Sequence, residues 1–307
     1  MFKTYFDKYK KLSCWSKIII ISIFVVIIVF TMKKYKIRKE GFTQRDKYVK
    51  KKNIDAYDAF YSEIYDDLVY NNSKNIFEIN EVKRILPEND ATKALDIGSG
   101  TGHHVHLLNL KGIDAIGVDA SPSMIEKAKE LYPKWRYDEG NVENSMLYPS
   151  NTFDLITCFY FTLYYFKDKV TFFKNCAQWI KPNGILVIHL VNRDEFNPIL
   201  PAANPLSLVS VQKYAKNRIT NSLVKFKDFQ YKANFDIGKD VKNAKFREIL
   251  KDDVTGHIRE NVHEFDMPTQ KYILSLASDQ GFKLKGRIDL TNCLYEYQYL
   301  YVLQKEY

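Results

Sequence analysis

The sequence has few cysteines, and they show none of the spacings that bind zinc. The four are Cys14, Cys158, Cys176 and Cys293. No two of them form a CxxC pair, and Cys158 and Cys176 lie in apolar stretches typical of reduced core residues. His103, His104 and His106 lie close together, but no further ligand is evident nearby. The sequence therefore predicts neither a disulfide framework nor a metal site.

The body of the chain also lacks an excess of positive charge. The 307 residues have a net charge of +9, from 46 Lys and Arg against 37 Asp and Glu. Residues 1–52 hold 15 basic and 3 acidic residues, or +12, so residues 53–307 hold 31 and 34, or −3. A nucleic-acid-binding surface needs positive charge. We therefore expect no nucleic-acid partner, although a local basic groove remains open.

One long uncharged run, Ile18 to Met32, lies near the N-terminus. At about 1.5 Å per residue it covers roughly 22 Å, short of a ~30 Å hydrocarbon core. Residues 12–32 together are long enough if Lys17 extends its ammonium group to the surface, and Trp15 would then lie at the interface. Lysines flank both ends and no small-residue cleavage site follows. We therefore expect a single-pass transmembrane helix rather than a core helix or a signal peptide.

The charges that flank this segment predict its orientation. Five lysines precede it, and ten Lys and Arg lie between Lys33 and Lys52. The more basic flank stays in the cytosol, so the body should face the cytosol. Residues 1–52 would form an anchor and a basic juxtamembrane linker, either held near anionic lipid or simply solvated. Residues 53–307 would form one domain.

Strands and helices alternate through the middle of the chain. The expected strands are 93–97, 113–118, 135–140, 153–158 and 184–191, and the expected helices between them are 102–111, 122–131 and 167–180. Two helices, 54–70 and 73–86, precede them, and the first should act as a lid. This alternation predicts a parallel sheet with helices on both faces, which binds ligands beyond the carboxyl ends of its strands.

Residues 194–266 interrupt this alternation. Period-two stretches at 219–237, 244–250 and 254–265 predict antiparallel strands. Inserted after the fifth strand, they should form a small sheet over the mouth of the active site. A helix at 268–278 and strands at 283–290 and 294–303 would then complete the domain.

The most informative motif is the run ALDIGSGTG at residues 94–102. Its glycines, Gly98, Gly100 and Gly102, allow backbone amides to approach a ligand, and the following helix points its positive end at the same place. A dinucleotide fingerprint needs a glycine where His103 stands. Asp119 ends the next apolar run, where it can accept both hydroxyls of a ribose. The sequence predicts a nucleoside-containing cofactor.

The spacing D-x-G-x-G-x-G from Asp96 to Gly102, followed by Asp119, resembles the first motifs of class I (Rossmann-like) S-adenosylmethionine-dependent methyltransferases. The resemblance covers about 54–193 and 267–307. It implies S-adenosylmethionine as cofactor and an α/β fold, a Rossmann-like parallel sheet with an antiparallel closing strand. The signature of amino-methylating members is missing, because Cys158 to Phe161 reads CFYF. Nothing therefore suggests methylation of a base amine or a glutamine amide.

The resemblance also implies which residues contact the cofactor. They are Asp96, Gly98, Ser99, Gly100, Gly102, Asp119, Ala120, Met124, Asn141, Val142 and Phe159. Asn141 departs from the family, which usually has an acid beside the adenine amino group. An Asn carbonyl still accepts a hydrogen bond, so adenine binding is only mildly affected.

Catalytic residues are harder to identify, because methyl transfer needs mainly alignment, exclusion of water and removal of any acceptor proton. His189 is either a general base or a buried structural histidine. Tyr65 and Tyr160 either face the reacting groups or pack in the core. The candidate substrate residues are Tyr57, Tyr164, Arg193, Arg259 and His263. Each has a structural alternative. Arg259, Asn261 and His263, for example, lie on one face of an expected strand, and that face either lines a pocket or faces solvent.

These observations together predict a membrane-anchored, cytosol-facing methyltransferase that acts on a small-molecule or lipid-proximal acceptor. Two alternatives remain open. One is a catalytically inactive cofactor-binding scaffold. The other is a protein or RNA methyltransferase, which the −3 charge of the body disfavours.

Overall fold

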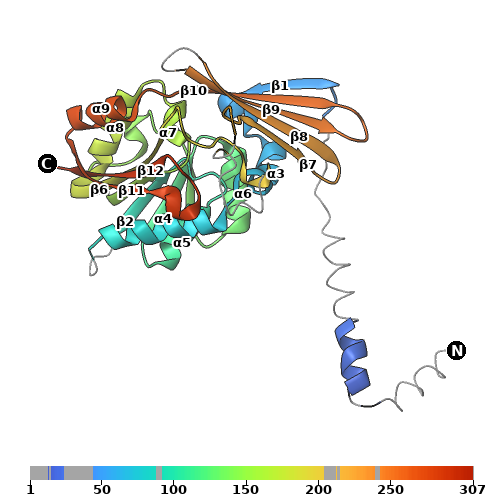
Figure 1. Ribbon diagram of the computed structural model, residues 1–307. Coiled ribbons are helices and arrows are strands. Elements are labelled where there is room, and N and C mark those ends of the chain that lie inside the picture. The colour runs from blue at the N-terminus through green and yellow to red at the C-terminus, as the bar shows by residue number, and fades with distance from the viewer. Residues whose placement is uncertain are drawn as a thin grey trace. The chain divides into compact units, whose positions relative to one another are not determined.

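The chain divides after Thr43 into two compact units. The computed structural model describes residues 13, 15–23, 44–87, 92–203, 212, 215–238 and 243–306. Two β-sheets and the helices that pack against them all belong to the second unit (Figure 1).

In the first unit, residues 15–23 are helical. Trp15 and the isoleucines at 18–21 and 23 are exposed. Within the described residues, no helix has both the length and the apolar character needed to cross a membrane. Residues 12, 14 and 24–32 of the expected transmembrane segment lie outside the described part of the chain.

The larger sheet has seven strands in the order β11-β12-β6-β5-β2-β3-β4. The strands are β2 (Lys93–Ile97), β3 (Asp114–Asp119), β4 (Arg136–Glu139), β5 (Phe153–Cys158), β6 (Ile180–Val191), β11 (Phe282–Asp289) and β12 (Gln298–Lys305). Neighbouring strands in the part of the sheet that runs β6-β5-β2-β3-β4 pair in parallel. Strand β12 runs antiparallel to both β6 and β11. The predicted parallel sheet with an antiparallel closing strand is confirmed.

Helices cover both faces of this sheet. They are α4 (Asn72–Ile85), α5 (His103–Leu110) and α6 (Pro122–Leu131) on one face, and α8 (Lys169–Trp179) and α9 (Gln270–Asp279) on the other. Strand residues alternate between the faces: Leu95 and Ile97 pack in the core with α8 and α9, and Ala94 packs with α4 and α5. Asp96 has the same parity as Ala94, so the buried carboxylate lies beneath α4 and α5.

The order of the strands creates a crevice beside β2. The chain adds β3 and β4 on one side of β2 and then returns to place β5 on the other side. Such a reversal separates the loops that follow the two central strands and is where parallel sheets bind ligands. The glycine loop after β2 and the segment Phe159–Thr162 after β5 meet here. A Cβ atom on Gly98 would lie 2.4 Å from Thr162 Cγ2.

The smaller sheet has five strands in the order β1-β10-β9-β8-β7. They are β1 (Tyr48–Lys52), β7 (Asn221–Lys225), β8 (Phe229–Ile237), β9 (Asn243–Asp252) and β10 (Ile258–Asp266). Strands β7 to β10 pair antiparallel, as expected for the insertion after the fifth strand. We call this sheet the cover sheet.

Six further helical elements lie in the connections between strands among the described residues. They are η1 (Asn53–Ala56), α3 (Ala59–Val69), η2 (Ser145–Leu147), α7 (Thr162–Tyr165), η3 (Pro201–Ala203) and η5 (Leu290–Cys293). The helix expected over 54–70 is therefore a 3-10 turn followed by α3. Asp58 caps α3 by accepting a hydrogen bond from the Tyr61 amide, and Asn71, rather than Ser73, caps α4.

The structure corrects the boundary expected after residue 52. Strand β1 pairs in parallel with β10, with Tyr48 opposite Ile258. The Gln44 side chain donates to the Ile258 carbonyl over 2.9 Å, and the Tyr48 hydroxyl contacts Glu260. The sequence YVKKK resembles a linker because three of its five residues are lysines, but lysines are also common on edge strands, where they discourage pairing with other chains. Residues 44–52 therefore belong to the domain.

This pairing predicts different stabilities for two N-terminal truncations. The fragment 53–307 lacks β1 and leaves the backbone groups of β10 unpaired, whereas 44–307 keeps them. We expect 53–307 to be about 2 kcal/mol less stable, given the net value of a few hydrogen bonds. Urea denaturation of both fragments measures the difference. Equal midpoints would show that β1 does not join the cover sheet.

Candidate functional site

A pocket lies where the crevice beside β2, helix α3 and the cover sheet meet. Among the residues predicted from the sequence, those that line it are Tyr57, Tyr65, Gly98, Ser99, Gly100, Phe159, Tyr160 and His263. They come from segments at both ends and in the middle of the domain. The expectation that the insertion closes over the glycine loop is thereby confirmed.

The glycine loop owes its shape to backbone conformations that other residues rarely adopt. Gly98 has a φ of 68° and Gly100 a φ of 52°, both in the left-handed region. A Cβ atom on Gly98 would collide with Thr162, whereas one on Gly100 would meet only Tyr65, at 3.9 Å. The loop therefore presents backbone, with no side chain at these two positions, to the pocket. This is what close approach of a ligand requires.

Asp119 holds this loop from the neighbouring strand. Its Oδ2 accepts a hydrogen bond from the Gly100 amide over 2.9 Å, and its Oδ1 accepts one from the Ser121 amide over 2.9 Å. Burial raises the pKa of this carboxyl, and the backbone donors oppose that effect. The Ser121 hydroxyl donates to the Tyr57 carbonyl over 2.5 Å, which places the segment before α3 beside the end of β3.

Several predicted cofactor residues do not line the pocket. They are Asp96, Gly102, Asp119, Ala120, Met124, Asn141 and Val142. Asn141 is exposed and accepts a hydrogen bond from the Glu143 amide, and Met124 and Val142 are buried. Gly102 is the N-cap residue before α5, and a Cβ atom there would lie 2.7 Å from the Tyr137 hydroxyl oxygen. Their contact with a cofactor therefore stays a prediction.

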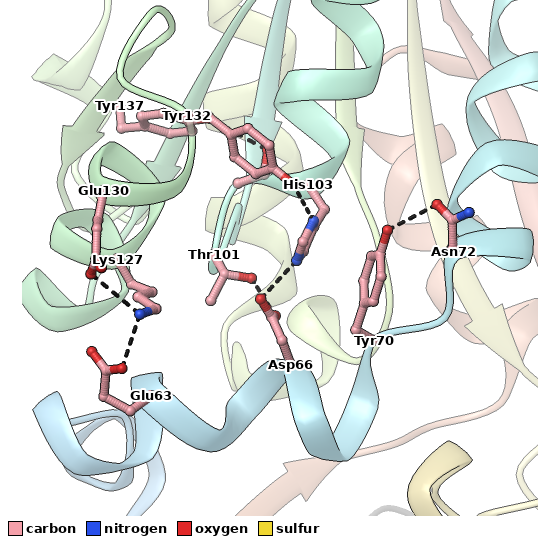
Figure 2. Close-up of polar contacts among 11 residues, drawn as sticks. Glu63, Asp66, Tyr70, Asn72, Thr101, His103, Lys127, Glu130, Tyr132 and Tyr137 are labelled. Atoms are coloured by element: carbon pink, nitrogen blue, oxygen red, sulfur yellow. Dashed lines mark hydrogen bonds and ion pairs between the residues drawn. The ribbon is translucent and has the colours of Figure 1, made fainter. Parts of the chain in front are cut away.

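Helix α3 is fastened over the glycine loop by the contacts in Figure 2. Asp66 accepts hydrogen bonds from the Thr101 hydroxyl at 2.7 Å and from His103 Nε2 at 2.8 Å. His103 also stacks on Tyr70, and its Nδ1 lies 2.6 Å from the Tyr132 hydroxyl. This histidine therefore positions α3. No cluster able to hold a metal ion occurs among the residues that the structure describes.

A buried polar group lies beneath α4, on the same face of the sheet as Asp96. Lys74 lies 2.7 Å from Glu78, whose other oxygen lies 3.0 Å from His104 Nε2. Burial alone would raise the pKa of Glu78, but Lys74 and His104 lower it to about 2. Burial raises the pKa of Asp96 to about 6, even though Thr157 donates to it over 2.7 Å.

His189 occupies a position that favours the structural alternative over the general base. It has no exposed surface, does not line the pocket, and its Nδ1 lies 2.6 Å from the Tyr160 carbonyl oxygen. Burial, with a further contribution from Lys74, lowers its pKa from 6.5 to about 4. The predicted location of His189 near the end of β6 is confirmed. Its side chain lies on the same face of the sheet as that of Val187, which packs in the core with α4.

Three predicted substrate residues hold the structure together instead of lining the pocket. The Tyr164 hydroxyl accepts a hydrogen bond from the Val191 amide over 2.8 Å, and Arg193 donates to the Gly238 carbonyl over 2.9 Å. Arg259 donates over 2.9 Å to each of the Asp58 carboxylate, the Ala56 carbonyl and the Asn261 side chain. Arg259, Asn261 and His263 are all buried, so the solvent-facing alternative was wrong.

The structure also joins two predicted substrate residues, Tyr57 and His263, to Tyr165 and Glu248, which the sequence analysis did not identify. The Tyr57 hydroxyl lies 2.8 Å from the Tyr165 hydroxyl, which lies 2.7 Å from His263 Nδ1. His263 Nε2 lies 2.8 Å from the Glu248 carboxylate. Burial would raise the pKa of Glu248, but His263 and tyrosine donors lower it below its usual range. Side chains alternate between the two faces of β9, and this alternation places Glu248 on the buried face. That alternation is the sequence pattern that could have identified Glu248.

Comparisons with known proteins agree with this geometry. Residues 95–188 match the methyltransferase domain family. A mitochondrial ubiquinone biosynthesis O-methyltransferase from Schizosaccharomyces pombe is 33% identical over 129 residues, which are 40% of this chain and 46% of that protein. The chain thus spans less than half the length of the curated relatives it matches.

Solved structures show the same fold. A S-adenosylmethionine-dependent methyltransferase from Clostridium acetobutylicum superposes with a TM-score of 0.60 at 17% identity, covering 80% of this chain and 97% of that one. An amino pentose methyltransferase from Micromonospora echinaspora, solved with S-adenosylmethionine bound, gives 0.54 at 17% identity, covering 76% and 90%. Together with the family match, these findings confirm the predicted methyltransferase domain and its cofactor, S-adenosylmethionine.

The burial of His189 predicts a pH dependence of stability. Its pKa is about 4 in the folded protein against an ordinary 6.5, so the folded state favours the neutral ring. This contribution is fully present above pH 6.5 and is lost as the pH falls to about 4, amounting to about 3 kcal/mol. Substitution His189→Gln should flatten that part of the profile. Urea denaturation between pH 7.5 and 4 measures it, and an unchanged slope would refute the assignment.

Proposed function

We propose that the protein transfers the methyl group of S-adenosylmethionine to a small-molecule or lipid-proximal acceptor bound in the pocket. The observation that carries the proposal is that the glycine loop and the cover sheet line one and the same cavity. Cofactor and acceptor would therefore meet between the crevice beside β2 and the strands above it. Holding the two reactants together, away from water, supplies most of what methyl transfer needs.

The residues of the loop fit the cofactor. Backbone at Gly98 and Gly100 leaves room for its methionine portion, and Asp119 at the end of β3 is the acid that would bind the ribose. The cofactor supplies an electrophilic methyl group bound to a sulfonium. Tyr65 and Tyr160, which line the pocket near the loop, would pack around that group and exclude water.

The cover sheet favours a small acceptor over a macromolecule. Aromatic side chains from β8, β9 and β10 line the pocket. The −3 charge of residues 53–307 gives no general attraction for nucleic acid. An inactive scaffold would bind the cofactor without forming product, so turnover separates that alternative from an enzyme.

We further propose that residues 12–32 anchor the protein in a membrane, with the body in the cytosol. Two observations support this proposal: the isoleucines at 18–21 and 23 are exposed on a helix, and basic residues flank the apolar run. A row of exposed isoleucines is costly in water and favourable in lipid. Anchoring would raise the effective concentration of an acceptor that resides in the membrane.

Substitution Gly100→Arg tests the cofactor site. Its side chain would project into the pocket, so we expect at least a 100-fold loss of affinity for S-adenosylmethionine. The matched control is Gly112→Arg, because Gly112 also has a positive φ, 78°, but a Cβ there meets nothing within 4 Å. Both variants should lose about 1–2 kcal/mol of stability from backbone strain. Calorimetric titration of residues 44–307 measures binding; equal affinities for the two variants would reject the site.

Membrane fractionation tests the anchor. The full chain expressed with a C-terminal tag should sediment with membranes and resist extraction by alkaline carbonate, whereas residues 44–307 should stay in the supernatant. Protease added to the cytosolic side should degrade the body. A full chain recovered in the supernatant, or a truncated chain that still sediments, would contradict the assignment of residues 12–32.

A further inference from the structure

We propose that Tyr165, His263 and Glu248 form a proton relay that deprotonates a weakly acidic hydroxyl group, of the phenol class, on an acceptor bound beneath the cover sheet. The inference rests on the methyl transfer proposed above and specifies its acceptor and its base.

The hydrogen bonds of Glu248 determine which nitrogen of His263 carries a proton. Glu248 has no exposed surface and accepts hydrogen bonds from the Tyr61 hydroxyl over 2.7 Å and the Tyr231 hydroxyl over 2.5 Å. A carboxylate can only accept, so His263 Nε2, at 2.8 Å, must be the donor. In the neutral ring, Nδ1 is then an acceptor, and the Tyr165 hydroxyl at 2.7 Å donates to it.

The open end of this chain of hydrogen bonds faces the pocket. Tyr57, Tyr165 and His263 all line the cavity, whereas Glu248 does not. Tyr165 ends α7, the same short helix whose first residue, Thr162, contacts the glycine loop at Gly98. The Tyr57 hydroxyl, 2.8 Å from that of Tyr165, orients it. A proton accepted from the pocket can therefore pass inward through Tyr165 to His263, beside the buried Glu248 carboxylate, without crossing solvent.

The cavity beside the relay is apolar and aromatic. Phe161, Phe235, Phe246 and Phe265 line it, with ring centroids 5.7 Å apart for Phe161 and Phe265 and 6.1 Å apart for Phe235 and Phe246. Of the described residues that line the pocket, the one lysine, Lys74, lies on α4 and no arginine is present. An aromatic acceptor packs well there. Lys74 is paired with Glu78 at 2.7 Å, so apart from the cofactor's own sulfonium no side chain among these residues is available to hold the hydroxyl as an anion. The hydroxyl would therefore bind neutral and lose its proton inside the pocket.

The proposed step balances atoms and charge. The acceptor oxygen forms a bond to the transferred methyl carbon, and the bond from that carbon to sulfur breaks with its electron pair remaining on sulfur. The acceptor hydroxyl proton passes to the Tyr165 oxygen while the Tyr165 proton passes to His263 Nδ1. The resulting imidazolium is stabilised by the Glu248 carboxylate and loses its proton to water after product leaves. The products are the methyl ether, S-adenosylhomocysteine and a proton.

Tyr165 suits transmission of a proton rather than storage of a negative charge. Burial raises the pKa of its hydroxyl well above the usual range, so tyrosinate does not accumulate. The proton can leave Tyr165 only as another arrives, which couples deprotonation of the acceptor to His263. His189, the base expected from the sequence, lines no part of the cavity.

A series of ring-substituted phenols of graded acidity, incubated with the full chain in detergent and S-adenosylmethionine, tests the relay. Formation of S-adenosylhomocysteine is measured for wild type, Tyr165→Phe, His263→Gln and Glu248→Gln. With weakly acidic phenols we expect each variant to lose about 10²- to 10⁴-fold in kcat. The same three variants should methylate phenols that are already ionised at the assay pH at near wild-type rates, because these phenols have no proton to remove. A merely structural role would slow all phenols equally, and that result would overturn the relay.

The matched control is Tyr164→Phe, the neighbouring tyrosine whose buried hydroxyl accepts from the Val191 amide away from the pocket. It should show no dependence of its rate loss on phenol acidity. A loss like that of Tyr165→Phe would count against the relay.

Two measurements separate this inference from the proposed function. Calorimetry of each variant with S-adenosylmethionine should give wild-type affinity. If wild type itself fails to bind, methyl transfer is rejected; if it binds but methylates no phenol, the acceptor class is rejected. Nitrogen-15 NMR of the histidine rings tests the relay without any cofactor. A His263 signal with Nδ1 as acceptor, shifted in Tyr165→Phe, supports it, and a protonated Nδ1 in the neutral ring overturns it.

Discussion

Glu248 is the buried charge on which the assembly of the pocket depends. Its carboxylate has no exposed surface and accepts hydrogen bonds from Tyr61 of α3, Tyr231 of β8 and His263 of β10. An ionised carboxylate is costly to bury unless donors surround it. Strand β9 can therefore occupy its place only when α3 and both neighbouring strands are in theirs. The cover sheet is thus coupled to the helix that closes over the glycine loop.

A second set of contacts completes the enclosure from below. Asp66 joins α3 to Thr101 and His103 at the start of α5, and Asp119 joins the loop at Gly100 to the end of β3. Arg259 ties β10 to the segment before α3 through Asp58 and Ala56. These polar links surround a cavity whose wall is otherwise largely aromatic. Because they join α3, the glycine loop and the cover sheet, they hold the walls of the cavity together.

Sequence patterns predicted the parallel sheet, the glycine loop and the inserted strands, because each depends on local periodicity or on glycine. They did not predict β1, since three lysines in a row resemble a linker, and they left the role of His189 open between a general base and a buried structural histidine. The sequence left open whether Arg193 and Arg259 contact a substrate or lie on the surface, because it does not show which groups accept hydrogen bonds from their donors. In the fold, backbone carbonyls and Asp58 satisfy them.

By itself, then, the sequence determined the chemistry of the cofactor loop, because a left-handed backbone at Gly98 and Gly100 is encoded by the residues themselves. It likewise determined the charge distribution and the apolar N-terminal run. Only the tertiary structure decided what faces the acceptor. Tyr165 of α7 and His263 of β10 lie 98 residues apart in the sequence, and they become hydrogen-bonded partners only when the cover sheet packs over α7. No local pattern encodes such a contact, because it depends on the relative placement of two sheets.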